Sequence, residues 1–279
     1  MLTIKTENKN MNIFIAPPAH QNEPSSRLYL WKQRTFYIGP ILDPVQFSQG
    51  AASFAVSLGG TIQFSSKQLK EEVSCRSILI PPGTEIECNS GTAPVAICML
   101  DALGNDYSSL LPLMQNNVQN IAYGIKKEDS YIEAFTEHFY HEQPPEDIYQ
   151  CLDTLIPLYH QENRHHNVDP RIAKVIDLIQ ENINDNLSIE ILAGNVELSV
   201  PRLTQLFRLQ TGVPIRRYRL WHRLFCSMAD LTKNGSLTSS AIDAGFSDAS
   251  HFNRTFKSMF GMTPTNLLMQ SNGIKIFTE

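Results

Sequence analysis

Short apolar runs dominate the first hundred residues of the chain. Between residues 28 and 100 these runs are rich in β-branched and aromatic residues, and turn-forming sequences such as Gly59-Gly60 and Pro81-Pro82-Gly83 separate them. Several short strands at this spacing are typical of a small barrel or sandwich. Residues 1–25 have weaker periodicity and are expected to form a mobile arm or an irregular edge. The predicted strands are 28–31, 35–38, 52–58, 61–64, 77–80 and 94–100.

After residue 105 the apolar positions recur at intervals of three and four, which indicates helices. The pattern predicts helices over 107–116, 131–140 and 147–160. The polar segment 163–169 interrupts it and is interpreted as a linker. A further helix is expected from Pro170, because Asp169 suits the N-cap and proline suits the first turn.

A helix-turn-helix pattern follows over residues 188–208. Ser188 is placed to cap a short apolar helix, and Ser199 to cap a second helix with Pro201 in its first turn. Leu203, Leu206 and Phe207 would face inward, which leaves polar residues outside. The second helix of such a unit can lie in the major groove of DNA. Taken alone, this unit is equally well explained as a surface helix of a bundle. Its candidate DNA-binding residues are Ser199, Pro201, Arg202, Thr204, Gln205 and Arg208.

The same layout recurs over residues 236–257. Ala244-Gly245-Phe246 predicts a tight turn, and Ser247 or Asp248 is placed to cap a helix whose inner face carries phenylalanines at intervals of four. The repeat weakens the packing interpretation and favours DNA reading by both units. One long helix over 216–231 would set their spacing. The candidate DNA-binding residues here are Ala249, Ser250, His251, Asn253, Arg254 and Lys257.

The charge is unevenly divided, which resolves an apparent conflict between DNA binding and the net charge of −5. Residues 1–168 contain 11 Lys and Arg against 18 Asp and Glu, a net charge of −7, whereas residues 169–279 contain 12 against 10, a net charge of +2. The C-terminal part is therefore the expected partner of phosphate. Four of its positive charges lie close together, at Arg216, Arg217, Arg219 and Arg223.

Residues 170–270 resemble the AraC/XylS family of bacterial transcription regulators, and the sequence from Ala241 to Pro264 is close to the signature of that family. The resemblance implies seven helices. It places Pro201, Thr204 and Gln205 near bases in the first unit. In the second unit it places Ser250, His251 and Arg254 there. The family often has a larger polar residue where Pro201 stands, so base contacts by the first unit are less strongly implied.

The resemblance also implies a cupin-like sensor in the N-terminal part. A metal-binding cupin needs several histidines, but residues 21–137 contain none, and Ile86 stands where the cupin turn would supply one. No metal and no cofactor are therefore expected. His138 with His141, and His165-His166, are interpreted as ordinary helix and linker residues. A small-molecule effector is expected, and the aromatic residues that either line its pocket or simply form core are Trp31, Phe36, Tyr37, Phe47, Phe54 and Phe64.

Cysteine and apolar content complete the expectation. The five cysteines form no Cys-x-x-Cys pair, and neither a signal peptide nor a long apolar run is present, so a cytoplasmic protein with reduced thiols is predicted. The expected fold class is α+β with two domains. Residues 1–105 would form the cupin-like β-barrel sensor and 106–162 a helical connector. A linker over 163–169 would lead to an all-α tandem helix-turn-helix domain over 170–279.

The expected function is an effector-controlled, sequence-specific transcription regulator that acts as a homodimer. Its partners would be double-stranded promoter DNA, the effector and RNA polymerase. Two alternatives are a constitutive regulator whose barrel only dimerises, and a cupin-type enzyme with a helical appendage. The connector helices offer either a dimer interface or packing against the barrel. Their candidate residues are Phe135, Phe139, Leu152, Leu155 and Leu158.

Overall fold

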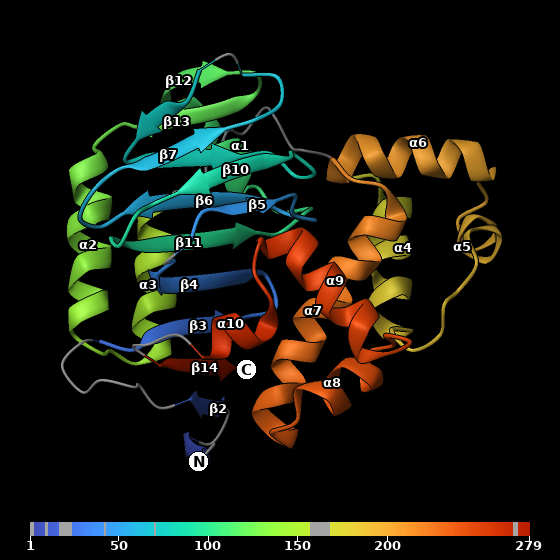
Figure 1. The fold of residues 1–279 in the computed structure, drawn as a ribbon. Coiled ribbons are helices and arrows are strands. Elements are labelled where there is room, and N and C mark those ends of the chain that lie inside the picture. The colour runs from blue at the N-terminus through green and yellow to red at the C-terminus, as the bar shows by residue number, and fades with distance from the viewer. Residues whose placement is uncertain are drawn as a thin grey trace.

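Two β-sheets share an apolar core in the N-terminal part of the chain (Figure 1). The computed structural model describes residues 3–8, 11–16, 24–41, 43–69, 71–156, 168–269 and 273–279. The larger sheet has ten strands, in the order β1 (Thr3–Asn8), β2 (Met11–Ala16), β14 (Ile274–Thr278), β3 (Ser26–Leu30), β4 (Arg34–Pro40), β11 (Pro94–Leu100), β6 (Ala52–Ser57), β9 (Ser77–Ile80), β13 (Ile121–Ile125) and β12 (Met114–Val118). The smaller sheet has four strands, in the order β5 (Val45–Phe47), β10 (Ile86–Asn89), β7 (Ile62–Ser65) and β8 (Val73–Cys75).

The larger sheet is covered on both faces, because successive side chains of a strand point to opposite sides. Leu28 and Leu30 of β3 belong to the core shared with the smaller sheet. Tyr29 and Trp31 belong to a second core on the other face, where α2 (Glu128–Tyr140) and α3 (Pro145–Leu155) cover the sheet. Strands buried on both faces read as continuous apolar runs, which is why the pattern of β3, β4 and β6 shows little alternation.

All six strands that the sequence predicts are present, but the predicted helix over 107–116 is wrong beyond its first turn. The chain forms α1 (Asp106–Leu110) and a 3-10 turn (Leu111–Leu113), and then β12 and β13 extend the larger sheet as a hairpin. Gln119 and Asn120 join these two strands with φ values of 50° and 67°, the left-handed conformation that tight hairpin turns require. Residues 114–125 therefore belong to the sheet rather than to a helical connector.

The C-terminal region contains seven helices among its described residues, as the family resemblance implies. They are α4 (Pro170–Glu181), α5 (Ile189–Asn195), α6 (Val200–Thr211), α7 (Ile215–Asn234), α8 (Leu237–Asp243), α9 (Ala249–Phe260) and α10 (Pro264–Leu268). Helices α4 to α6 form a separate core with the start of α7. The rest of α7 and α8 to α10 share the core of the two sheets. Figure 1 accordingly shows α7 and α9 next to the strands and α5 and α6 farther away.

The last strand departs from the expected all-α C-terminal domain. After α10 the chain returns to the larger sheet and adds β14 between β2 and β3. Among the described N-terminal residues, β1 and β2 pair as antiparallel strands at the edge of this sheet, and their register shifts between Lys5 and Asn8. Of the two expectations for this segment, the irregular edge is the one found. The predicted linker and Leu158 lie largely or wholly in 157–167, outside the described residues.

Candidate nucleic-acid interface and interdomain cavity

The first helix-turn-helix unit consists of α5 and α6, and its helix ends follow the sequence signals. The Ser188 hydroxyl accepts a hydrogen bond from the amide of Ile191 at 3.3 Å. Ser199 occupies the N-cap of α6, Pro201 lies in its first turn, and Gly212 ends it with a φ of 76°. All six candidate residues of this unit are exposed. Two of them bind each other, because Arg202 Nη1 donates to Gln205 Oε1 at 2.9 Å.

The second unit, α8 and α9, has the better capped reading helix. The Asp248 carboxylate accepts a hydrogen bond from the amide of His251 at 2.7 Å, so Asp248 is the N-cap that the sequence left open. The amide hydrogen bonds hold the pKa of this carboxyl below its usual range. Four phenylalanine and methionine side chains of α9 turn toward the core, and the opposite side of the helix is polar.

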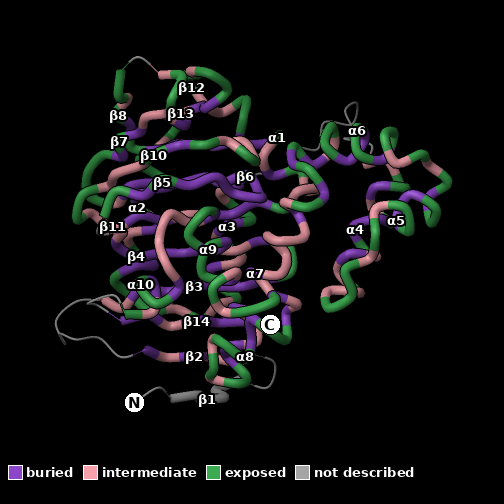
Figure 2. Tube along the Cα trace, turned by 45° about the vertical axis from the view of Figure 1, so that its right-hand side comes forward, coloured by how far each residue is buried: buried purple, intermediate pink, exposed green. Residues whose placement is uncertain are grey.

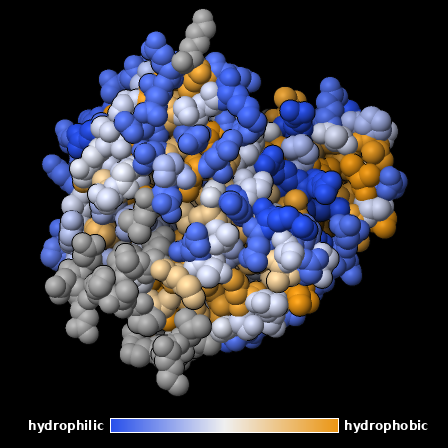
Figure 3. Space-filling view, in the orientation of Figure 1, coloured by the Kyte–Doolittle hydropathy of each residue, from blue (hydrophilic) through white to orange (hydrophobic). Residues whose placement is uncertain are grey.

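Exposure differs among the candidate residues of α9. Ser250, Asn253, Arg254 and Lys257 are exposed, and the side chains of the last three make no hydrogen bond or salt bridge within the part of the chain that the structure describes. His251 is half-buried, because its ring packs edge-on against Phe246 with the ring centres 5.3 Å apart. Strongly hydrophilic residues gather on the surface where α9 lies (Figure 3). Helix α9 therefore offers an amide and two cations to an anionic partner.

The arginine cluster of α7 is mostly engaged within the protein, which corrects its expected role as a phosphate partner. Arg217 donates to the carbonyl of Ser48 at 3.0 Å, and Arg223 donates to the carbonyl of Ile183 at 3.2 Å. Arg219 donates to the carbonyl of Leu187. Burial lowers the pKa of both Arg219 and Arg223. Arg216 is exposed, whereas Arg217, Arg219 and Arg223 are half-buried.

Close contacts fasten the second unit to the sheets. A Cβ on Gly50 would lie 2.5 Å from Cβ of Trp221, and a Cβ on Gly261 would lie 2.5 Å from Cβ of Val45. The amide of Ser48 donates to the carbonyl of Ser258 at 3.0 Å. The first unit touches the loop that follows β9 at Pro82, which would lie 2.9 Å from a Cβ on Gly212. These positions admit only glycine without displacement of a neighbour.

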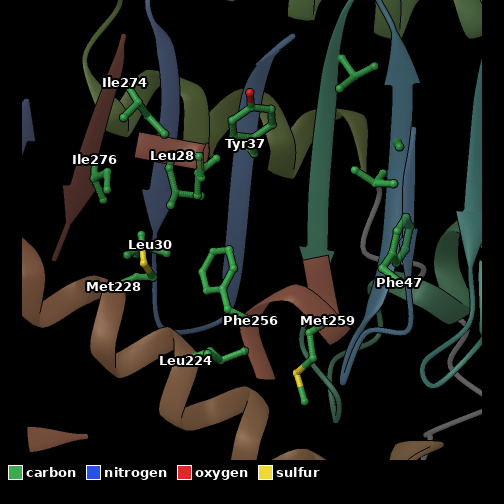
Figure 4. Close-up of a cluster of buried hydrophobic side chains, with 14 of the residues drawn as sticks. Leu28, Leu30, Tyr37, Phe47, Leu224, Met228, Phe256, Met259, Ile274 and Ile276 are labelled. Atoms are coloured by element: carbon green, nitrogen blue, oxygen red, sulfur yellow. The ribbon is translucent and has the colours of Figure 1, made fainter. Parts of the chain in front are cut away.

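A cavity of about 120 Å³ lies where the two sheets meet α7 and α9. Its wall is overwhelmingly apolar, and α7, α9 and the residues that follow α9 close one side of it. Figure 4 shows Met228 of α7 beside Leu30 of β3, and the ring of Phe256 from α9 pointing toward β4. The lining residues that the C-terminal region supplies are Trp221, Leu224, Phe225, Met228, Phe256, Phe260, Met262 and Leu267.

Two polar atoms of the cavity wall are buried and have no hydrogen-bond partner among the residues that the structure describes. They are Oε1 of Gln49 and Oγ of Ser90. A buried polar atom without a partner is costly, so each would gain from a hydrogen bond with a bound molecule. A second and more polar cavity of about 280 Å³ shares the residues Thr35, Met99, Trp221 and Phe225 with the first. Its wall also includes Asp101, Gln180 and His222.

The structure separates the six aromatic residues that the sequence offered for an effector pocket. Tyr37 and Phe47 line the apolar cavity, and Trp31 lines the polar one. Phe36 and Phe54 point to the opposite face of the sheet, where their rings contact those of Phe135 and Tyr131. Phe64 packs against Tyr123 as core. The sequence analysis did not predict the cavity residues of α7 and α9. The signal for them is the number of apolar residues on these two helices, which exceeds what a small helical unit needs for its own core.

The residues offered for a dimer interface follow the packing alternative. Phe135, Phe139 and Leu152 are at most 4% exposed, because they pack on the outer face of the larger sheet within one chain. Figure 2 shows that buried residues dominate central strands of this sheet such as β6 and β3. Leu155 is half-buried against the same core.

Two further site types are absent from the described ranges. No three His, Cys, Asp or Glu side chains come close enough there to hold a metal ion, and His165 and His166 lie outside those ranges. No helix among the described residues combines the length and the apolar character needed to cross a membrane.

Comparison with known proteins matches the C-terminal region to established regulators. A helix-turn-helix domain model matches residues 192–270. The transcriptional activator RhrA of Rhizobium meliloti is 34% identical over 111 residues, which cover 36% of this chain and 35% of that protein. The Msm operon regulatory protein of Streptococcus mutans is 30% identical over 124 residues, 43% of this chain and 44% of that protein. The XylDLEGF operon transcriptional activator 1 of Pseudomonas putida is 31% identical over 104 residues, 36% of this chain and 31% of that protein. The matches thus span less than half the length of these relatives.

The fold resembles a solved structure over nearly the whole chain. ToxT from Vibrio cholerae O395 superposes with a TM-score of 0.55 at 16% identity, over 85% of this chain and 97% of that one. ToxT with a bound unsaturated fatty acid gives a TM-score of 0.53 at 13% identity, over 90% of this chain and 98% of that one. The two-domain α+β architecture is therefore the one that the sequence predicts. The helix-turn-helix model over residues 192–270 and the identities to named activators show that the C-terminal region of this chain is a helix-turn-helix domain of the AraC/XylS type.

Proposed function

We propose that this protein is a sequence-specific DNA-binding transcription regulator. The observation that carries the proposal is the pair of capped reading helices, α6 and α9, each with its polar side exposed and held by a buried apolar side. Arginine and asparagine on such a helix can bind guanine, adenine or phosphate. Helix α7 joins the units with 20 residues, a length of roughly 30 Å at 1.5 Å per residue, close to one turn of DNA. Since two of the relatives are named activators, we propose activation as its mode.

The proposal is tested by the affinity of the full chain for its own upstream DNA across a salt series, against a scrambled duplex. Binding is expected to prefer the natural sequence and to weaken as salt rises. Arg254→Ala should weaken binding by about 1–3 kcal/mol, because it removes an unpaired cation from the exposed side of α9. Arg76→Ala is the matched control, since Arg76 is exposed on the sensor domain and pairs with Asp129. Equal affinities of the two variants would contradict the docking of α9.

An effector in the apolar cavity would connect the two domains directly. The sheets supply one part of its wall, and α7, α9 and the residues that follow α9 supply the rest, so a bound molecule would contact both domains. A ligand shifts the arrangement of two domains only if it binds one arrangement more tightly, and a wall shared in this way provides that difference. The composition of the wall suits a mainly hydrocarbon molecule with one or two hydrogen-bonding groups for Gln49 and Ser90. The structure of ToxT with an unsaturated fatty acid supports the same chemical class.

Filling the cavity tests this part of the proposal. Ala55 lines the cavity and is buried, so Ala55→Phe would occupy the space that a ligand needs. In a thermal-shift screen of hydrocarbon acids and alcohols, ligands that raise the Tm of the wild type should lose their effect on this variant. DNA binding without ligand should remain. The constitutive alternative, in which the barrel only dimerises, predicts no ligand-dependent shift in either protein.

A homodimer, with RNA polymerase as a partner, completes the proposed assembly. Phe135, Phe139 and Leu152 lie on the sides of α2 and α3 that face the sheet. The opposite sides of these two helices are therefore available for a dimer contact. The relatives reported above are named as regulators, and we accordingly propose no catalytic role for the N-terminal domain.

A further inference from the structure

The C-terminal strand β14 occupies an unusual position. Its two neighbours in the sheet, β2 and β3, are consecutive strands of the N-terminal domain, and β14 lies between them. It pairs antiparallel with β2 and parallel with β3, through five residue pairs on each side. A segment that follows the second helix-turn-helix unit therefore completes the sheet of the other domain.

Both faces of β14 are buried. Ile274 and Ile276 have no exposed surface and join the core that contains Leu224 and Met228 of α7 (Figure 4). On the opposite face the ring of Phe277 stacks on that of Tyr29, with centres 4.8 Å apart and planes 8° apart. Lys275 also pairs with Glu142 at 2.5 Å. Only Met269 to Gly273 separate α10 from this strand, so β14 ties the second unit to the sheet by a short connection.

The register of the neighbouring strands allows the sheet to close without β14. Ile276 pairs with Phe14 on one side and with Leu28 on the other, and Ile274 pairs with Ala16 and Ser26. If β2 moved by one strand spacing of about 4.8 Å, Phe14 would oppose Leu28 and Ala16 would oppose Ser26. Phe14 and Leu28 already face the same core, so the closure would keep every side chain on its present face. Since β2 is antiparallel to β3, the two strands could then form an ordinary hairpin.

We propose that β14 is a releasable latch that holds the second helix-turn-helix unit on the sensor sheet. When β14 leaves its slot, β2 and β3 pair with each other, so one ladder of hydrogen bonds replaces two. The unit then loses its covalently linked anchor and remains attached only through the contacts of α7, α9 and α10. Because α7 keeps the two units at a fixed spacing, release changes how easily the second unit leaves the sheet, and a unit free of the sheet can orient in the major groove beside the first. Release thus favours DNA binding by both units, a consequence that rests on the proposed function.

A disulfide across the slot tests the latch in the full chain. Ile15 and Lys275 are paired residues of β2 and β14, and both are half-buried on the outer face. The double variant Ile15→Cys, Lys275→Cys should bind upstream DNA at least ten-fold more weakly when oxidised than when reduced. The reduced form is the matched control, and wild type treated with the same oxidant controls for the native thiols. Equal affinity of the oxidised and reduced forms would overturn the control of DNA binding by β14.

Hydrogen exchange of the wild type without DNA tests release by itself. The amides of β14 should exchange at least ten-fold faster than those of β4 and β11, while the amides of β2 and β3 stay protected because these strands re-pair. Exchange of β14 no faster than that of β4, or exchange of all three strands together, would overturn the latch. This readout does not involve DNA, so absence of DNA binding in every form would count against the proposed function alone. A chain that ends at residue 270 should match or exceed the affinity of the reduced variant, and a lower affinity would contradict the latch.

Discussion

At the scale of single residues, His222 shows how position decides chemistry. It lies on α7 within the wall of the polar cavity, stacks on Phe225 and approaches Sγ of Cys226 at 3.6 Å. Burial lowers the pKa of its imidazole to about 4. The unfolded chain, with an ordinary pKa of about 6.5, therefore takes up a proton at pH values where the folded chain stays neutral.

The pH dependence follows from this shift. Between about pH 6.5 and 4 the unfolded state binds more protons than the folded state. The free energy of unfolding is therefore unaffected by protonation of His222 above pH 6.5 and decreases as the pH falls from 6.5 toward 4. His222→Gln removes the titrating group. The free energy of unfolding of the wild type should fall by roughly 2–3 kcal/mol more than that of the variant between pH 7 and 4. Denaturant titrations at several pH values measure this, and parallel curves for the two proteins would contradict it.

At the scale of elements, the turn between α8 and α9 depends on one glycine. Gly245 has a φ of 84°, and a Cβ there would lie 2.8 Å from the carbonyl oxygen of Ile183. Gly245→Ala should therefore destabilise the protein by about 1–3 kcal/mol. Gly194 in α5 is the matched control, because a Cβ there meets nothing within 4 Å. Gly194→Ala should stabilise by about 0.5–1 kcal/mol, since alanine suits a helix better. Chemical denaturation compares them, and equal effects would show that the turn tolerates a side chain.

At the scale of the whole molecule, the domains share one core instead of meeting at a polar boundary. Trp221 of α7 packs against Gly50, where a Cβ would come within 2.5 Å. Gly50→Val should displace Trp221, shift tryptophan emission to longer wavelength and destabilise the protein by about 1–3 kcal/mol. Gly59→Val, at an exposed position with open space around it, should leave the spectrum unchanged. An unaltered emission spectrum for Gly50→Val would contradict the close contact between residue 50 and Trp221.

Local sequence signals determined the two helix-turn-helix units. Ser188, Ser236 and Asp248 cap helices through their own side chains, and Gly212 and Gly261 end helices in the left-handed conformation. The inner faces of α6 and α9 follow the apolar spacing of the sequence. The six apolar runs likewise became strands. These features depend on residues within a few positions of one another, which is why the sequence by itself specifies them.

Only the tertiary structure decided how these elements combine. Strand β12, Met-Gln-Asn-Asn-Val, carries no apolar alternation of its own and is defined by its pairing with β13. The Ile-Lys-Ile alternation of β14 suits a strand, but only the fold places that strand between β2 and β3. The sequence suggests that the arginines of α7 bind phosphate, but in the folded chain Arg217 and Arg223 donate to the carbonyls of Ser48 and Ile183. The apolar sides of α7 and α9 could have closed a helical core or covered a sheet. Their partners lie more than a hundred residues away in the sequence, so only folding brings them together and makes the cavity a surface of both domains.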